Sequence, residues 1–440
     1  MEFLRQAPRR DAEDITEVTQ RVAGMINDIR ERGEAAVREY SRQLDNWDPD
    51  DFRVSDDVVA AAEGRISAEL KEAIDFAQDQ VRTFAQLQRD TLLDLEVETR
   101  PGVTLGHRHV PVQSVGAYVP GGRYALIASS YMSVIPARVA GVEKVVVATP
   151  ARDGEVHPGL LYSAQRAGAD AVYAVGGAQA IAALATGALP GLDPVDMVVG
   201  PGNRYVVEAK RQLFGQVGID LLAGPTEIGI VADDSADPYI VACDLVGQAE
   251  HDPYSRAVLI TTSRSLGEAV IAQMDEHLAA VSTEDVARQC WENGGEVILV
   301  RDEDELVAVS DDYALEHIEV LLREPRRMID RLRHYGSLFV GEEATVAYGD
   351  KVSGPNHILP TLRAARFTGG LWVGKFLKTV TFQHMTREAS LEMARYCDIE
   401  ATAEGMVAHA RTATVRIDRY TDGAGAARAA VQHAQRNADG

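Results

Sequence analysis

The chain has 440 residues, of which 46% are hydrophobic and 25% charged, as in a globular protein of two or three domains. No apolar run approaches the roughly 20 residues that a membrane-spanning helix needs. The N-terminal segment also lacks the apolar core and cleavage site of a signal peptide. The formal net charge of −23 argues against nucleic-acid binding, because phosphates require a basic surface. We therefore expect a cytoplasmic protein.

The charged residues are unusual in kind as well as in sign. Only six of the 44 basic residues are lysines. An acidic, lysine-poor surface suits a salt-rich cytoplasm, where screening weakens the self-repulsion of the charge. We therefore favour a halophilic protein, and an acidic mesophilic protein is the alternative. The three cysteines, at 243, 290 and 397, have no CxxC spacing, so neither a disulfide framework nor a cysteine-based zinc site is expected.

Hydrophobic periodicity predicts the order of the elements. Residues 12–92 have apolar residues at three- and four-residue steps, which indicates helices. An alternating stretch then leads to a glycine-rich turn at residues 120–122. Beyond it, apolar strands alternate with amphipathic helices, first in VEKVVVATP, DAVYAVGG and VDMVVGPGN, then in EIGIVAD, RAVLITT and GEVILV. This pattern predicts an α/β fold with Rossmann-like parallel sheets covered by helices on both faces. The chain becomes helical again after about residue 365.

Three glycine-containing turns, VPGG, VGGAQ and VGPGN, fall at the carboxyl ends of predicted strands. Ligands of parallel sheets bind outside these ends. None of the turns is the GxGxxG fingerprint, so that motif gives no support for a dinucleotide. Taken singly, each is an ordinary loop. Three along one sheet edge favour a nucleotide-sized ligand.

Four segments combine ionisable residues with helix ends or turns. They contain Gln248 and His251 before an Asp-Pro break, Glu316 beside His317, the loop residues Asp350, Lys351, Asn356 and His357, and Glu404 five residues before His409. Each segment alone is more often structural, as a helix cap, a solvated helix start, a turn or a surface histidine. Four of them in a chain with only 11 histidines strengthen the case for a functional site.

Over nearly its whole length the sequence resembles the histidinol dehydrogenase family. The matching segments, in family order, are YVPGG, VGGAQAIAALATG, VGPGNRYVVEAKRQ, GIDLLAGPTE, DLVGQAEHD, YALEHIEV, YGDKVSGPNHILPT and EGMVAHA. The resemblance implies an NAD-dependent alcohol dehydrogenase that converts a primary alcohol through the aldehyde to a carboxylate with two NAD⁺. It also implies an aldehyde-dehydrogenase-like architecture and a homodimer with shared active sites.

The resemblance assigns roles to residues position by position. The implied zinc ligands are Gln248, His251, Asp350 and His409, the last completing the site of the partner subunit. Zinc suits two imidazoles with oxygen ligands, although Mn²⁺ or Co²⁺ could occupy the same set. Glu316 would activate water and His317 would act as general base, for which its ordinary pKa near ~6.5 is suitable. The implied NAD contacts are Tyr118, Gln179 and Asn203, and the implied substrate contacts are Thr226, where the family usually has serine, His357 and Glu404.

The same resemblance gives an expected division into domains. Residues 1–20 form an N-terminal arm, and residues 21–115 with 235–365 form a first α/β domain that carries the catalytic and metal-binding residues. Residues 116–234 form a second α/β domain that binds NAD. Residues 366–440 form a dimerisation tail that carries His409.

At some positions the chain departs from the biosynthetic members of the family. Lys351 and Arg411 stand where those members usually have tyrosine and asparagine. These departures are similar to the sulfopropanediol dehydrogenase branch, which oxidises 2,3-dihydroxypropane-1-sulfonate to sulfolactate. A sulfonate is a permanent anion that favours Lys or Arg donors, so we list both residues as substrate contacts. Histidinol is the alternative substrate, and both cations could instead face solvent. A catalytically idle ligand-binding protein is the alternative of another class.

Overall fold

The computed structural model describes residues 1–8, 16–121 and 124–421. The chain divides into two compact units. The larger unit comprises Met1–Thr91 and Pro111–Leu377, and the smaller comprises Leu92–Val110 and Lys378–Gly440. Of the turns and tail singled out in the sequence, Gly122 and everything after residue 421 lie outside the described residues. Among the described helices, none combines the length and the apolar character needed to cross a membrane.

A six-stranded sheet of the larger unit has the order β1-β11-β10-β9-β12-β13. Its strands are β1 (Glu2–Arg5), β9 (Glu227–Ala232), β10 (Arg256–Thr261), β11 (Gly295–Leu299), β12 (His317–Leu321) and β13 (Ser337–Val340). All neighbours are parallel except β1, which runs antiparallel to β11. The central strands are buried along their length, as expected for a parallel sheet covered on both faces.

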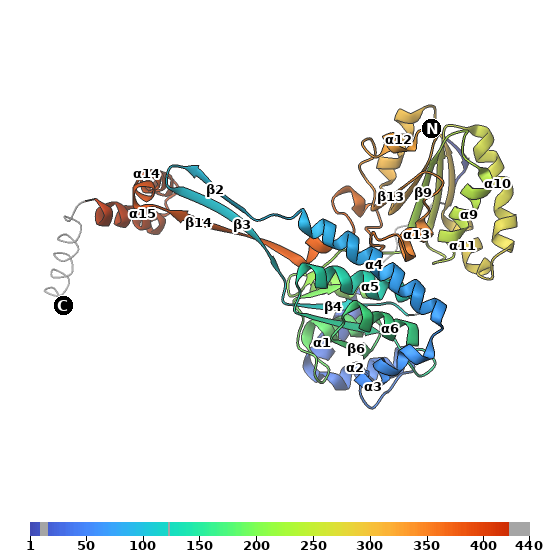
Figure 1. The fold of residues 1–440 in the computed structure, drawn as a ribbon, viewed down its shortest axis with the longest axis horizontal. Helices are drawn as coiled ribbons and strands as arrows, with labels where there is room; N and C mark the ends of the chain where they lie inside the picture. Colours follow the sequence, from blue (N-terminus) through green and yellow to red (C-terminus); the bar gives the residue numbers. More distant parts are fainter. Residues whose placement is uncertain (9–15, 122–123, 422–440) are drawn as a thin grey trace. The chain divides into compact units, whose positions relative to one another are not determined.

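Helices cover the two faces of this sheet (Figure 1). They are α9 (Pro238–Ala249), α10 (Arg264–Ala279), α11 (Glu284–Gly294) and α12 (Glu303–Tyr313). The first three share a core with one set of β9 and β10 side chains, including Ile230 and Leu259. Leu306 of α12 shares a second core with the alternate set, including Val231 and Val258. The period of two along each strand thus separates the two cores.

A five-stranded sheet of the same unit has the order β6-β5-β4-β7-β8, and all its neighbours are parallel. Its strands are β4 (Ser114–Tyr118), β5 (Lys144–Thr149), β6 (Ala171–Ala174), β7 (Met197–Val199) and β8 (Gly218–Ile219). The helices between them are α5 (Ile127–Ala140), α6 (Pro158–Ala167), α7 (Gly177–Thr186) and α8 (Arg204–Leu213). These elements alternate as the hydrophobic pattern predicts, so this sheet is a Rossmann-like layer.

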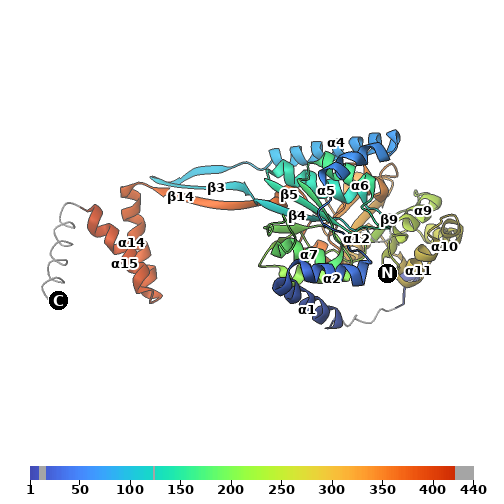
Figure 2. The same ribbon diagram turned by 90° about the horizontal axis from the view of Figure 1, so that it is seen from below.

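The N-terminal helices join the five-stranded sheet (Figure 2). They are α1 (Thr16–Arg32), α2 (Glu34–Asp45), α3 (Asp56–Ala61), the 3₁₀ turn η1 (Ala62–Arg65) and α4 (Ala68–Asp90). Helix α1 packs on α7 and α8, α2 packs on α7, and α4 packs on α5 and α6. The apolar stripe of α1, with Val22, Ile26 and Ile29, lies in the same core as Ile181 and Val198.

The smaller unit consists of a three-stranded sheet and two helices. Its elements are β2 (Leu95–Arg100), β3 (Val103–Pro111), β14 (Leu377–Met385), α14 (Arg387–Ala403) and α15 (Val407–Tyr420), and the strand order is β14-β3-β2. Helices α14 and α15 pack on each other. Large apolar side chains stay exposed on both helices, among them Tyr396, Ile399 and Val407. Two helices and three strands are too few to bury them.

The structure confirms the α/β class and the two parallel sheets, but it divides the chain differently from our expectation. Helices α1–α4 belong with the five-stranded sheet rather than the six-stranded one. Residues 92–110 belong with the C-terminal segment, and β9 lies in the six-stranded sheet although it precedes the expected boundary at residue 234. Hydrophobic periodicity identifies the apolar face of a helix but not the sheet against which this face packs. The sheet that helices α1–α4 join was therefore not predictable from it.

Candidate active site

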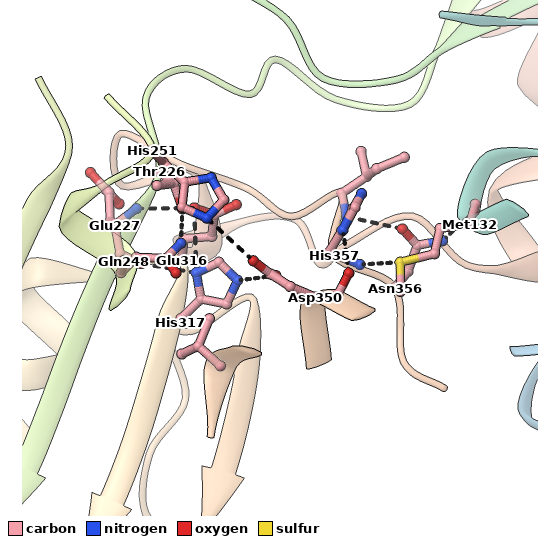
Figure 3. Close-up of polar contacts among 12 residues, drawn as sticks. Met132, Thr226, Glu227, Gln248, His251, Glu316, His317, Asp350, Asn356 and His357 are labelled. Carbon is pink, nitrogen blue, oxygen red and sulfur yellow. Dashed lines mark hydrogen bonds and ion pairs between the residues drawn. The ribbon is translucent and has the colours of Figure 1, made fainter. Parts of the chain in front are cut away.

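Six polar side chains converge at one edge of the six-stranded sheet (Figure 3). They are Thr226, Gln248, His251, Glu316, His317 and Asp350. Thr226 immediately precedes β9, and Glu316 immediately precedes the first residue of β12, so this edge carries the amino ends of the strands. Doubly wound sheets usually bind ligands at the carboxyl ends. In this sheet the candidate site lies at the amino ends instead, where backbone groups of the strands bind the site's side chains.

Glu316 is buried and held by two donors. Its Oε2 accepts a hydrogen bond of 2.5 Å from the Thr226 hydroxyl and one of 3.0 Å from the backbone N–H of Glu227. Burial raises the pKa of Glu316 to about 7, although the adjacent His317 opposes the shift. A carboxyl group with such a pKa can both accept and release a proton near neutral pH.

His317 is also buried, and its tautomer follows from its contacts. Nδ1 donates to the backbone carbonyl of Glu227 at 3.0 Å, because a carbonyl can only accept. Nε2 lies 3.6 Å from Oδ1 of Asp350. Burial disfavours the imidazolium, but the carboxylates of Glu316 and Asp350 outweigh it and raise the pKa of His317 to about 9. The ordinary pKa that we expected for this base is therefore wrong for the chain alone, because two acids lie beside the ring.

Gln248, His251 and Asp350 belong to this cluster of side chains (Figure 3). Gln248 lies in the last turn of α9, and His251 follows the residue that caps this helix. The helix therefore ends between these two residues. Asp350 comes from the short helix α13 (Val346–Lys351), and its Oδ2 lies 3.8 Å from Nε2 of His251. The imidazoles of His317, His357 and His251 lower the pKa of Asp350 despite its burial.

The donor set of these three residues fits a divalent metal. Two ligands of one tetrahedral zinc ion are roughly 3.3 Å apart, close to the His251–Asp350 separation of 3.8 Å. Gln248 donates its amide N–H to Thr226 at 2.5 Å, which leaves its amide oxygen as a ligand. Among the described residues, no three His, Cys, Asp or Glu side chains cluster as a metal site. Of the expected zinc ligands, the larger unit supplies only one histidine, His251, and one acid, Asp350.

The loop after α13 is tied to α5. His357 donates from Nδ1 to the carbonyl of Asp350 at 3.0 Å, and its Nε2 therefore accepts from the Ser129 hydroxyl at 2.8 Å. Burial lowers the pKa of His357 to about 4, so this imidazole is neutral. Asn356 donates to the carbonyl of Met132 at 2.5 Å, and the Tyr131 hydroxyl donates to the carbonyl of Lys351 at 2.5 Å.

Lys351 places a cation beside this site. Its side chain is exposed, and no acidic side chain among the described residues forms an ion pair with it. Burial lowers the pKa values of His251 and His357, and the charge of Lys351, which follows Asp350 in the chain, lowers them further. An unpaired cation at this position can bind an anionic group of a ligand.

The expected NAD contacts lie at the carboxyl ends of strands in the five-stranded sheet. Tyr118 ends β4, and its buried hydroxyl accepts from the backbone N–H of Gly177 at 3.1 Å. Gln179 donates to Asp45 at 2.8 Å, while its buried Oε1 has no partner among the described residues. Asn203 caps α8 and is exposed. An orphaned amide oxygen beside glycine turns fits a hydroxyl-bearing ligand such as a nucleotide.

The remaining expected residues belong to the smaller unit. Glu404 caps the C-terminus of α14, and His409 and Arg411 lie on α15. All three side chains are exposed. No ion pair involving them occurs within the described part of the chain. Of the expected residues, the larger unit therefore brings together Gln248, His251, Asp350, Glu316 and His317.

Sequence reasoning missed several residues of the site. The backbone of Glu227 binds both Glu316 and His317, and burial raises the pKa of its own side chain to about 7. Ser129 and Tyr131 lie in an otherwise apolar helix, where the run of hydroxyls in IASSYMS was an available signal. Asp45 gave none, because it meets Gln179 only through the packing of α2 on α7.

Thr226 was expected to contact substrate, and its contacts are of another kind. Its hydroxyl donates to Glu316 and accepts from Gln248. The side chain thus links the carboxyl group to the amide of the expected metal ligand. In this arrangement it orients its neighbours rather than presenting a free hydroxyl.

Comparison with known proteins decides the family. The family model described as histidinol dehydrogenase matches residues 8–417. The chain belongs to the histidinol dehydrogenase family. It is therefore an NAD-dependent dehydrogenase that acts on CH–OH donors. A crystal structure of the family, "Histidinol Dehydrogenase from Elizabethkingia anophelis", superposes with a TM-score of 0.87 at 32% identity and covers 94% of each chain.

Two curated relatives of this family member carry different names. A "Histidinol dehydrogenase homolog" of Shouchella clausii is 51% identical over 92% of this chain and 95% of its own length. A "Sulfopropanediol 3-dehydrogenase" of Ruegeria pomeroyi is 44% identical over 96% of this chain and 97% of its own length. Membership in the family is thus secure, and the names of its relatives do not agree on one substrate.

Proposed function

We propose that the protein is a zinc- and NAD-dependent dehydrogenase that oxidises a primary alcohol through the aldehyde to the carboxylate and reduces two NAD⁺. The observation that carries this proposal is the buried pair of Glu316 and His317 beside Gln248, His251 and Asp350 (Figure 3). An idle ligand-binding protein has no need for two buried titratable groups next to metal-type donors.

The buried pair supplies the proton transfers that such an oxidation needs. His317 takes the hydroxyl proton of the alcohol at Nε2, because Nδ1 is occupied by its bond to the backbone. The carbon then loses a hydride to NAD⁺ and becomes an aldehyde. Glu316 takes a proton from water as it adds to the carbonyl, and the resulting hydrate loses a second hydride. These steps release a carboxylate, two NADH and protons.

Gln248, His251 and Asp350 would hold the metal, together with His409 of the partner subunit. Bound zinc would act as a Lewis acid that positions the alcohol oxygen, and it would offset the carboxylate charge that raises the pKa of His317. Tyr118, Gln179 and Asn203 would hold NAD at the five-stranded sheet. The exposed apolar side chains of α14 and α15 would form part of a homodimer interface.

We propose 2,3-dihydroxypropane-1-sulfonate as the substrate. Lys351 supports this assignment, because an ammonium without an ion pair among the described residues, next in the chain to Asp350, suits a sulfonate and repels the amine of histidinol. Glu404 and Arg411 would reach the same substrate from the partner subunit. The relative named sulfopropanediol 3-dehydrogenase is consistent with this choice.

A substrate panel followed by NADH absorbance tests the proposal. Purified enzyme with zinc and NAD⁺ should form two NADH per dihydroxypropanesulfonate, and chelation of the metal should abolish the reaction. A stoichiometry of one, with free aldehyde accumulating, contradicts the four-electron reaction. Efficient oxidation of L-histidinol without oxidation of the sulfonate contradicts the substrate assignment and leaves the family chemistry intact.

A further inference from the structure

A buried ion pair lies behind one of the glycine turns of the five-stranded sheet. Lys210 of α8 and Asp220, which follows β8, bond to each other, and their side chains are 1% and 0% exposed. Moving two charges out of water is costly, and a buried ion pair stabilises a fold less well than apolar residues of similar volume. The pair therefore needs an explanation other than stability alone.

Both charged groups bind the same residue, Gly200. The Lys210 ammonium donates to the carbonyl of Gly200 at 2.9 Å. The backbone N–H of Gly200 donates to Oδ2 of Asp220 at 2.8 Å. The other carboxylate oxygen also accepts from the backbone N–H of Leu221 at 2.7 Å. The ion pair thus holds the peptide groups on both sides of one glycine.

Gly200 cannot be held by a side chain of its own. Its φ is +119°, and a Cβ at this position would lie 2.0 Å from the carbonyl oxygen of Tyr118. The residue is the first after β7, so the ladder with β4, which ends at Val199, no longer fixes it. Without the ion pair, the buried N–H and C=O of Gly200 would lack these partners.

The turn held in this way carries the expected dinucleotide contacts. Asn203, three residues after Gly200, accepts from the N–H groups of Tyr205 and Val206 through Oδ1. This bond orients the amide so that its NH₂ group is left to donate to a ligand. The backbone of Tyr118 lies close to Gly200. A shift of Gly200 would therefore move two expected NAD contacts at once.

We propose that Lys210 and Asp220 are positioning residues for the dinucleotide, which they serve by fixing the turn from Gly200 to Asn203 before NAD⁺ binds. This inference rests on the proposed function, because it takes the turn to be part of the NAD site. A purely structural role predicts that removal of the pair lowers stability and affects all substrates alike. A positioning role predicts a selective loss of NAD⁺ binding.

The informative variant is the double change Lys210→Met with Asp220→Asn. Lys210→Met alone would leave the Asp220 carboxylate buried without its cation, and Asp220→Asn alone would leave the Lys210 ammonium buried without its anion. The matched control is Glu208→Gln with Arg211→Gln. This pair also bonds within α8, with distances of 2.7 Å, but it does not touch Gly200. Gly200→Ala disturbs the same turn from the other side and leaves the ion pair in place.

Calorimetric titration of NAD⁺ without alcohol, and hydrogen exchange over residues 197–206, give readouts that do not depend on turnover. The double variant and Gly200→Ala should bind NAD⁺ at least about tenfold more weakly and exchange faster in this segment. The KM for the alcohol and kcat should change little, and the control should match the wild type. Wild-type affinity in a folded double variant overturns the positioning role, as does unaltered binding by Gly200→Ala. Failure of the wild type to bind NAD⁺ at all overturns the proposed function as well.

Discussion

The site residues fall into two groups with opposite surroundings. Gln248, Glu316, His317 and Asp350 of the larger unit are each at most 6% exposed. In contrast, Glu404, His409 and Arg411 of the smaller unit are exposed, and their charged groups form no ion pair within the described residues. The first group is built within one chain. The second has the chemistry of a metal and anion site but no ion-pair partners among the described residues, as we expect of residues that complete a site in another subunit.

The strongest test of the buried group is His317→Ala. Loss of this base should lower kcat by about 10²–10⁴-fold. The histidine of the exposed group, His409, should not replace it as a base. His334→Ala is a matched control, because that ring also donates from Nδ1 to a backbone carbonyl, at 3.0 Å, but lies outside the site. Steady-state NADH formation measures both. If kcat stays within threefold of the wild type, His317 is not the base.

Lys351 should distinguish a sulfonate substrate from an uncharged alcohol. Lys351→Met should lower kcat/KM for dihydroxypropanesulfonate by about 10- to 100-fold, since a charge-assisted contact is worth roughly 1.5–3 kcal/mol. An uncharged diol should be affected much less. Lys144→Met is the control. Lys144 is the first residue of β5 in the five-stranded sheet and forms an ion pair with Asp193. An equal loss for both alcohols would show that Lys351 does not recognise the anion.

Glu319, a buried acid of β12 that lies two residues after His317, predicts how stability varies with pH. Burial, with the nearby charge of Asp244, raises the pKa of Glu319 to about 8, from 4.5. A group with a raised folded pKa contributes stability below its unfolded pKa and loses it as pH rises through the folded pKa. Glu319 should therefore lower the free energy of unfolding by up to roughly 1.4 kcal/mol per pH unit between these values. Urea unfolding should show a flatter profile for Glu319→Gln. Identical slopes would exclude Glu319 as a source.

The alternation of apolar strands and helices predicted the α/β class, whereas the residues of the candidate site were predicted only through the family resemblance. Strand β12, which begins at His317, was not among the strands predicted from the apolar runs, although it positions Glu316 and His317. The raised pKa of His317 was not predictable, because it depends on Asp350, which meets the ring only after two segments pack. The union of residues 92–110 with the C-terminal segment was equally hidden, since strand pairing between distant segments leaves no local pattern.

Subunit mixing tests the central contrast most directly. His251→Ala removes a half-buried ligand that lies beside the buried group, and His409→Ala removes one from the exposed group, so each homodimer should lose zinc and activity. Compared without zinc, the His409→Ala variant and the wild type should have the same Tm, because this side chain is exposed within one chain. Mixed dimers of the two variants should regain one intact site, with zinc and turnover near a quarter to a half of the wild type, depending on the fraction of heterodimers. No recovery, under conditions in which tagged subunits demonstrably exchange, would contradict a site shared between chains.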